Sequence, residues 1–163
     1  MKETAMLNLL LPPRVDNAYR GSRLALWLFA LLLFLKLVMS VNSIFNGYSV
    51  ATSADGIPLD TFPPAGAQAF VSLFAILGLS NFIICLLGLV VLVRYRGLIP
   101  FMFALLLFEH LGRKLIFYFL PIVRTGTSSA SYINLILLAL MIAGLALSLR
   151  NRVALQVQEL PSR

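Results

Sequence analysis

Residues 98–123 read LIPFMFALLLFEHLGRKLIFYFLPIV, an apolar segment that carries four ionisable side chains near its middle. The segment is 26 residues long, and about 20 residues of α-helix are enough to cross the hydrocarbon core of a bilayer. A charge near the centre of an isolated helix costs about 2.5–3.5 kcal/mol on insertion scales. The segment therefore predicts a transmembrane helix whose charges are paired, hydrated or long enough to reach the interface.

The remainder of the chain is also strongly apolar. Its 163 residues are 60% hydrophobic and 12% charged, with a mean hydropathy of +0.94, whereas soluble domains are about 45–50% apolar and about 25% charged. Three further apolar segments predict spans over residues 24–44, 67–93 and 132–149. We therefore expect an all-α integral membrane protein, a four-transmembrane-helix bundle whose membrane domain covers residues 24–149.

The basic residues predict the orientation of this bundle. Nine of them lie in residues 1–23, in the connection after the second span and in the tail 150–163, whereas the opposite connections hold Arg124 alone. Because basic residues resist translocation, both termini are expected in the cytoplasm, with 1–23 as an N-terminal segment and 150–163 as a tail. This asymmetry and the small size indicate a bacterial-type plasma (inner) membrane. The nine residues are Lys2, Arg14, Arg20, Arg23, Arg94, Arg96, Arg150, Arg152 and Arg163.

A depth estimate brings polar residues of three spans to the same level. At 1.5 Å per residue, Lys36, Asn81 and Glu109 lie about 17–18 Å from the cytoplasmic ends of their helices. The midplane of the hydrocarbon core is about 15 Å deep. We therefore expect these three side chains to meet near the centre of the membrane.

The third span adds three more polar groups around Glu109. Arg113 follows Glu109 by four residues and can pair with it along one helix face. His110 and Lys114 have the same spacing and are displaced by about 100° from the first pair. The candidate intramembrane polar site is thus composed of Lys36, Asn81, Glu109, His110, Arg113 and Lys114.

Small residues predict where the helices approach one another. In membranes, small side chains four positions apart allow two helix backbones to come close. The fourth span holds two such pairs, and on the second span Gly78 and Gly88 belong to a stripe of small or polar residues with Asn81 and Cys85. Trp27 is expected to face lipid because it lies opposite Lys36 on the first span. The predicted packing residues are Gly78, Gly88, Ala139, Ala143, Gly144 and Ser148.

The composition excludes several classes of site. One cysteine and one histidine exclude an internal disulfide, a cysteine-rich zinc site and a multi-histidine metal site within one chain. The sequence holds no phosphate-binding loop, no serine nucleophile elbow and no basic–aromatic surface for nucleic acid. No cofactor, metal or nucleic-acid partner is therefore expected, and none of the motifs identifies a family.

Three hypotheses of function remain. The first is an accessory or assembly subunit without catalysis, whose partners are the lipid bilayer and either a second copy or other membrane subunits. In it, Lys36 and Glu109 form a structural ion pair that fixes the arrangement of the helices. The second is a proton- or ion-coupled small transporter or channel that uses Lys36, Glu109, His110 and Arg113. The third is an intramembrane enzyme, the least favoured because Glu109 and His110 point about 100° apart.

Overall fold

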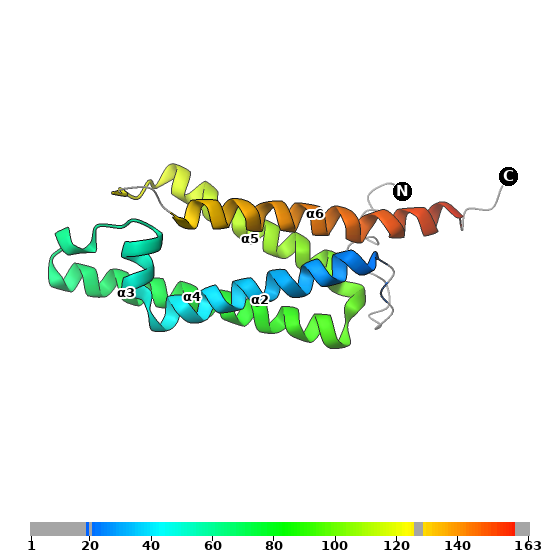
Figure 1. The fold of residues 1–163 in the computed structure, drawn as a ribbon, viewed down its shortest axis with the longest axis horizontal. Coiled ribbons are helices and arrows are strands. Elements are labelled where there is room, and N and C mark those ends of the chain that lie inside the picture. The colour runs from blue at the N-terminus through cyan, green and yellow to red at the C-terminus, as the bar shows by residue number, and fades with distance from the viewer. Residues whose placement is uncertain (1–18, 20, 126–128, 159–163) are drawn as a thin grey trace.

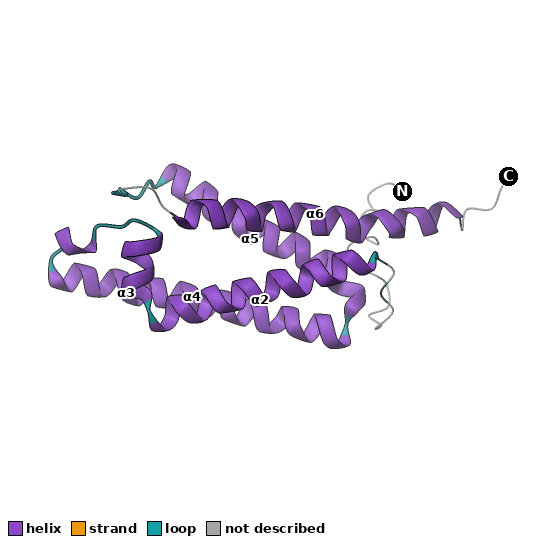
Figure 2. Ribbon diagram, viewed as in Figure 1, coloured by secondary structure: helices purple, strands orange, loops and turns teal. Residues whose placement is uncertain are grey.

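The computed structural model describes residues 19, 21–125 and 129–158, and this part of the chain consists of helices joined by loops, with no strand (Figure 1; Figure 2). Of its helices, α2, α4 and the 130–150 part of α6 are long and apolar enough to cross a membrane. A fourth, α5, is 21 residues long and contains the charged sequence described above. The long helices are α2 (Arg23–Phe45), α4 (Pro64–Arg94), α5 (Ile99–Phe119) and α6 (Ser129–Gln158).

Local chemistry explains where the helices begin. The side chain of Ser22 accepts a hydrogen bond from the backbone N–H of Ala25 at 3.2 Å, so α2 starts at the next residue, Arg23. Proline opens α4 and lies in the first turn of α5, where the missing N–H has no intrahelical partner to lose.

Two predicted spans differ from the helices at their ends. The helix α5 ends at Phe119, before the end of the predicted span 98–123, because Pro121 disfavours the helical conformation of Leu120, which has φ −123° and ψ 74°. The helix α6 continues beyond the predicted span 132–149 to Gln158, through a stretch without glycine or proline. The tail 150–163 thus begins as a continuation of that helix. The N-terminal segment 1–23 lies almost wholly outside the described residues.

The four long helices form two pairs. α2 packs along α4, and α5 packs along α6, while α2 also contacts α6 and so joins the pairs. Figure 1 shows that the pairs diverge toward the end that carries α3 and approach at the opposite end, where α2 begins and α4 meets α5. α4 and α5 contact each other little.

The region where the pairs converge holds the apolar core. Phe29 of α2 meets Phe103 of α5 edge to face, with ring centroids 5.1 Å apart, and both are fully buried. Because lipid tails are as apolar as leucine, close van der Waals packing drives helix association in a membrane. The other buried members are Leu32, Leu33, Val91, Ile99, Met102, Leu106, Leu137 and Met141.

Three glycines mark the closest approaches between helices. A Cβ atom placed on Gly144 would lie 2.3 Å from the ring of Phe103, and one on Gly88 would lie 2.5 Å from Cδ2 of Leu33. On Gly78 it would lie 3.0 Å from Cβ of Ser43. A side chain at any of these positions would therefore force a neighbouring side chain or helix to shift.

The predicted small-residue pair of Ala139 and Ala143 is exposed and does not lie at a contact between the described helices. The buried stripe of α6 instead contains Leu137, Met141, Gly144 and Ser148. At 100° per residue the two alanines point to the opposite side of the helix. Spacing alone did not identify which small pair faces the neighbouring helices.

The connection between α2 and α4 folds as a cap over the diverging end. It contains α3 (Gly47–Ser49), a π-helical segment η1 (Val50–Ala54) and a 3₁₀ turn η2 (Leu59–Thr61). Its buried apolar residues pack against Ile122 of the segment after α5. Gly56 has a φ of 68°, and its carbonyl accepts a hydrogen bond from the N–H of Thr125 at 2.8 Å. These contacts therefore join the connection between α2 and α4 to the segment that follows α5.

Two acidic residues of the cap have defined surroundings. Asp60 accepts a hydrogen bond from the hydroxyl of Tyr48, and this bond raises the pKa of Tyr48 above its usual value near 10. Burial raises the pKa of Asp55, more than the neighbouring Arg124 and Arg113 lower it. Both carboxyl groups thus belong to the folded structure of the cap.

We predict that Gly144→Ala destabilises the purified protein by about 1–3 kcal/mol, because the added methyl group overlaps the buried ring of Phe103. The matched control is Gly112→Ala in α5, where a Cβ atom would have no neighbour within 4 Å. It should leave stability unchanged or raise it by up to about 1 kcal/mol. Thermal unfolding in detergent measures both, and equal effects of the two variants would contradict the described packing.

Candidate functional site

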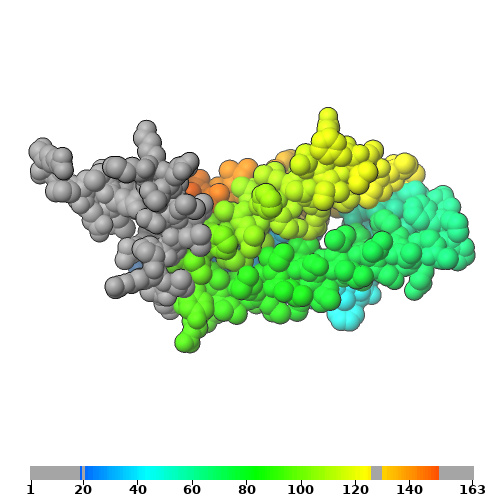
Figure 3. All heavy atoms as spheres, turned by 180° about the vertical axis from the view of Figure 1, so that it is seen from behind, coloured from blue at the N-terminus to red at the C-terminus, as the bar shows by residue number. Residues whose placement is uncertain are grey.

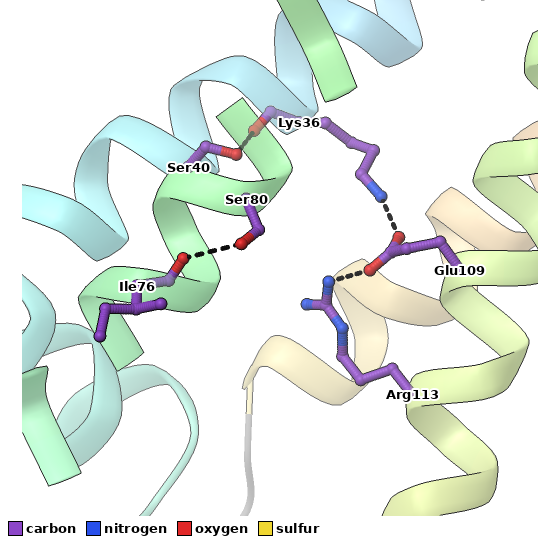
Figure 4. Close-up of polar contacts among 6 residues, drawn as sticks. All are labelled: Lys36, Ser40, Ile76, Ser80, Glu109 and Arg113. Carbon is purple, nitrogen blue, oxygen red and sulfur yellow. Dashed lines mark hydrogen bonds and ion pairs between the residues drawn. The ribbon is translucent and has the colours of Figure 1, made fainter. Parts of the chain in front are cut away.

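Three charged side chains, those of Lys36, Glu109 and Arg113, meet between α2 and α5 (Figure 4). Nζ of Lys36 donates a hydrogen bond to Oε2 of Glu109 at 2.7 Å. The guanidinium of Arg113, one turn further along α5, donates to the other oxygen of the same carboxylate. Glu109 therefore binds two cations, one from each of the helices that it joins.

The local sequence positions these groups. Glu109 and Arg113 are four residues apart on α5, which places their side chains on the same face. On α2, the backbone carbonyl of Lys36 accepts a hydrogen bond from the hydroxyl of Ser40 at 2.7 Å. Lys36 and Ser40 are both buried, so this face of α2 turns into the bundle and carries the ammonium toward α5.

Burial decreases along the three charged side chains. The side chain of Lys36 is 8% exposed, that of Glu109 is 20% exposed and that of Arg113 is 43% exposed. Removing an ion from water costs several kcal/mol, so Lys36 and Glu109 depend on each other. Arg113 lies on the accessible side of the carboxylate, and its ion pair is correspondingly weaker.

The accessible side of the cluster faces a lateral opening between α4 and α5. These helices contact each other little, and the space-filling view shows a gap between their surfaces (Figure 3). Figure 4 shows Arg113 extending from α5 toward α4, where the exposed Ser80 donates a hydrogen bond to the carbonyl of Ile76 at 3.1 Å. Ser80 was not predicted as part of the polar site, although a serine next to Asn81 inside a predicted span indicates a polar position.

Asn81 does not join the cluster as predicted. Its Oδ1 is buried and has no hydrogen-bond partner among the described residues, and no hydrogen bond links it to Lys36 or Glu109 there. The depth estimate gave the level of Asn81 in the membrane but not its neighbours. Because α4 contacts α5 so little, a short side chain on α4 does not reach the carboxylate.

His110 lies next to Glu109 in sequence but in a different environment. It is 8% exposed, and its Nε2 is buried without a hydrogen-bond partner in the described part of the chain. A buried polar nitrogen without a partner costs free energy, so this atom is an unused hydrogen-bonding position. Lys114, predicted to lie on the same face as His110, is exposed and makes no ion pair with any described residue.

The cluster consists of one carboxylate between two cations, which is a composition that does not suit a metal centre. Within the described residues, no group of three or more His, Cys, Asp or Glu side chains could hold a metal ion.

No protein-family model matches the chain, and comparisons with curated proteins and with solved structures found no match. The functional argument therefore depends on the chemistry of the residues themselves.

The charges inside α2 and α5 do not balance. Apart from Arg23 at the first residue of α2, three cations, Lys36, Arg113 and Lys114, accompany the carboxylate of Glu109. The carboxylate neutralises Lys36 in the interior and contacts Arg113 at the opening, while Lys114 lies outside the cluster. The arrangement can join two helices, and its exposed side can receive a small ion or a further polar group.

We predict that Glu109→Gln destabilises the protein by about 3–5 kcal/mol, because it leaves the buried charge of Lys36 unpaired. Lys36→Met should cost less, because Arg113 still pairs with Glu109. The double variant should recover most of the loss caused by Glu109→Gln, which a double-mutant cycle of unfolding in mixed detergent micelles measures. Arg113→Gln serves as the control and should cost about 0–1 kcal/mol, since its side chain is 43% exposed. Single variants of wild-type stability would show that the pair does not hold the fold.

Proposed function

We propose that the chain is a four-pass protein of a bacterial-type plasma membrane, with both termini in the cytoplasm. Three helices satisfy the length and composition of a span, and the 21 residues of α5 are long enough for a fourth. α2 begins and α6 ends at the same end of the molecule (Figure 1), as an even number of crossings requires. Arg23, Arg94 and Arg150 belong to this end, whereas Arg124 follows the opposite end of α5.

Within this membrane, we propose that the protein is an accessory or assembly subunit without catalysis. The observation that carries the proposal is the set of contacts made by the charged side chains of α2 and α5. Glu109 is held by two cations and fixes α5 to α2, which is the role of a structural clamp. Lys114 stays unpaired among the described residues on the surface that faces the surroundings, and polar residues inside membranes usually face protein or water.

We predict that the tagged protein, extracted in a mild detergent, purifies with one or more other membrane proteins in a constant ratio. Mass spectrometry and the size of the complex measure this, and an untagged chain expressed at the same level provides the background. Repeated recovery as a monomer without any partner would contradict the proposed function.

A proton- or ion-coupled transporter or channel is the second candidate, and two observations favour it. Nε2 of His110 is an unused hydrogen-bonding position beside the cluster, and the accessible side of Glu109 and Arg113 faces the opening between α4 and α5. In this mechanism, Glu109 binds the proton or cation, Lys36 and Arg113 act as counter-charges, and His110 relays protons. Because one chain of four helices is small for a carrier, this candidate expects a dimer.

For the second candidate, we predict that liposomes containing the purified protein show a flux of protons or cations that depends on pH. Glu109→Gln should abolish the flux, while Trp27→Leu, a change on the exposed side of α2, should preserve it. A fluorescent pH indicator and ion-sensitive dyes inside the vesicles measure the flux. A wild-type rate equal to that of empty liposomes would argue against transport of the tested ions.

A further inference from the structure

One side of α5 is left uncovered by the rest of the chain. Phe108 is 77% exposed and Tyr118 is 78% exposed, and Leu115 between them is 57% exposed. Together with Leu111 and Gly112 they line a shallow hollow of about 560 Å³. The opposite side of α5 packs against the bundle through the core residues described above. The exposed side is therefore a continuous surface that is open to the membrane.

Gly112 gives this surface the shape of a helix-binding groove. Gly78, Gly88 and Gly144 each meet an atom of a neighbouring helix, but a Cβ atom on Gly112 would have no neighbour within 4 Å. Glycine within a helix costs roughly 0.5–1 kcal/mol relative to alanine. A glycine without a packing role inside the chain thus leaves the backbone of α5 accessible to another helix.

Lys114 also lines this hollow and makes no ion pair with any residue that the structure describes. It lies fifteen residues after Ile99, or about 22 Å along the helix from its first residue. The end of α5 at Phe119 is about 7.5 Å further on. A cation at this level is costly in lipid, and the carboxylate of Glu109 is already bound by Lys36 and Arg113.

We propose that this surface, here called the α5 docking face, binds a transmembrane helix of a different protein that carries an aspartate or glutamate at the level of Lys114. The residues of the face are Phe108, Leu111, Gly112, Lys114, Leu115 and Tyr118. The inference rests on the proposed accessory function and specifies the chemistry of the partner.

Charge complementarity selects this occupant over two others. A second copy of the chain would bring the same surplus of cations, and its Glu109 would be bound by its own Lys36 and Arg113. Lipid tails would cover the apolar side chains but offer no partner to Lys114, whose stem would have to extend toward the end of α5, about 7.5 Å further along the helix, to approach the lipid phosphates. A carboxylate on a neighbouring helix neutralises Lys114 at its own level.

The test is photo-crosslinking in native membranes with the full-length chain. A photoreactive amino acid is placed on the α5 docking face at Phe108 or Leu115, and in separate controls at the exposed positions Trp27 of α2 and Ile136 of α6. We expect the α5 positions to form an adduct with one membrane protein, within an apolar segment that contains an Asp or Glu. The control positions should give that adduct at a level at least about tenfold lower.

The charge is tested in the same assay. Lys114→Leu should reduce the adduct about tenfold or more, and Lys114→Glu should abolish it. Changing the identified carboxylate of the partner to lysine should restore the adduct of Lys114→Glu. Arg124→Gln, which removes an exposed cation beyond the end of α5, is the matched control and should leave the adduct unchanged. Thermal unfolding of the purified variants verifies that they remain folded.

Several outcomes would overturn the inference. These are adducts with lipid alone or with a second copy of the chain, a partner segment without a carboxylate, and an adduct that does not depend on Lys114. Protein adducts from Trp27 or Ile136 without any from α5 would leave the accessory function standing while rejecting the α5 docking face. Absence of protein adducts from every position, together with purification as a monomer, would reject both.

Discussion

The ion pair between Lys36 and Glu109 is the constraint on which the arrangement of the helices depends. α2 and α5 contact each other at few positions, yet a 2.7 Å hydrogen bond between oppositely charged groups joins them near the middle of the bundle. Neither ion can be moved into lipid alone without a cost of several kcal/mol. The pair therefore favours the observed inward face of α5 and its position along α2, in agreement with the contact between Phe29 and Phe103.

The position of the pair divides the bundle into two parts. The fully buried apolar residues on α2 and α5 end at Leu33 and Leu106, one turn before the charges. On that side, Gly88 and Gly144 allow the helices to pack closely. Beyond the charges the helix pairs diverge, and the cap of α3, η1 and η2 covers the end. The carboxylate thus lies at the boundary between a tightly packed core and an open half, which explains why Lys36 is buried while Arg113 is accessible.

Periodicity predicted the helices, and counting residues along them brought Lys36 and Glu109 together, but neither predicted the neighbours of each helix face. Lys36 and Glu109 were placed together by counting residues, because a long side chain can bridge two helices at the same depth. The same residue count did not predict the contacts of Asn81, because a short side chain on α4 reaches Glu109 only if α4 lies directly against α5. The choice between Ala139–Ala143 and Gly144–Ser148 likewise depended on which helices pack together. The end of α5 could have been predicted from Pro121.

The two candidate functions make different demands on Glu109. For a transporter, the carboxylate must release at least one of its cations and exchange it for a proton or an ion. Lys36 is nearly enclosed and comes from another helix, so its release would loosen the bundle. Arg113 is more exposed and comes from the same helix as Glu109, so it is the partner that can leave without separating α2 from α5. An accessory subunit needs no such movement, because the clamp already neutralises the buried lysine and leaves Lys114 as the cation that a neighbouring protein can satisfy. The side chains that distinguish the two functions are therefore Arg113 and Lys114, on the accessible side of α5, and not the buried pair of Lys36 and Glu109.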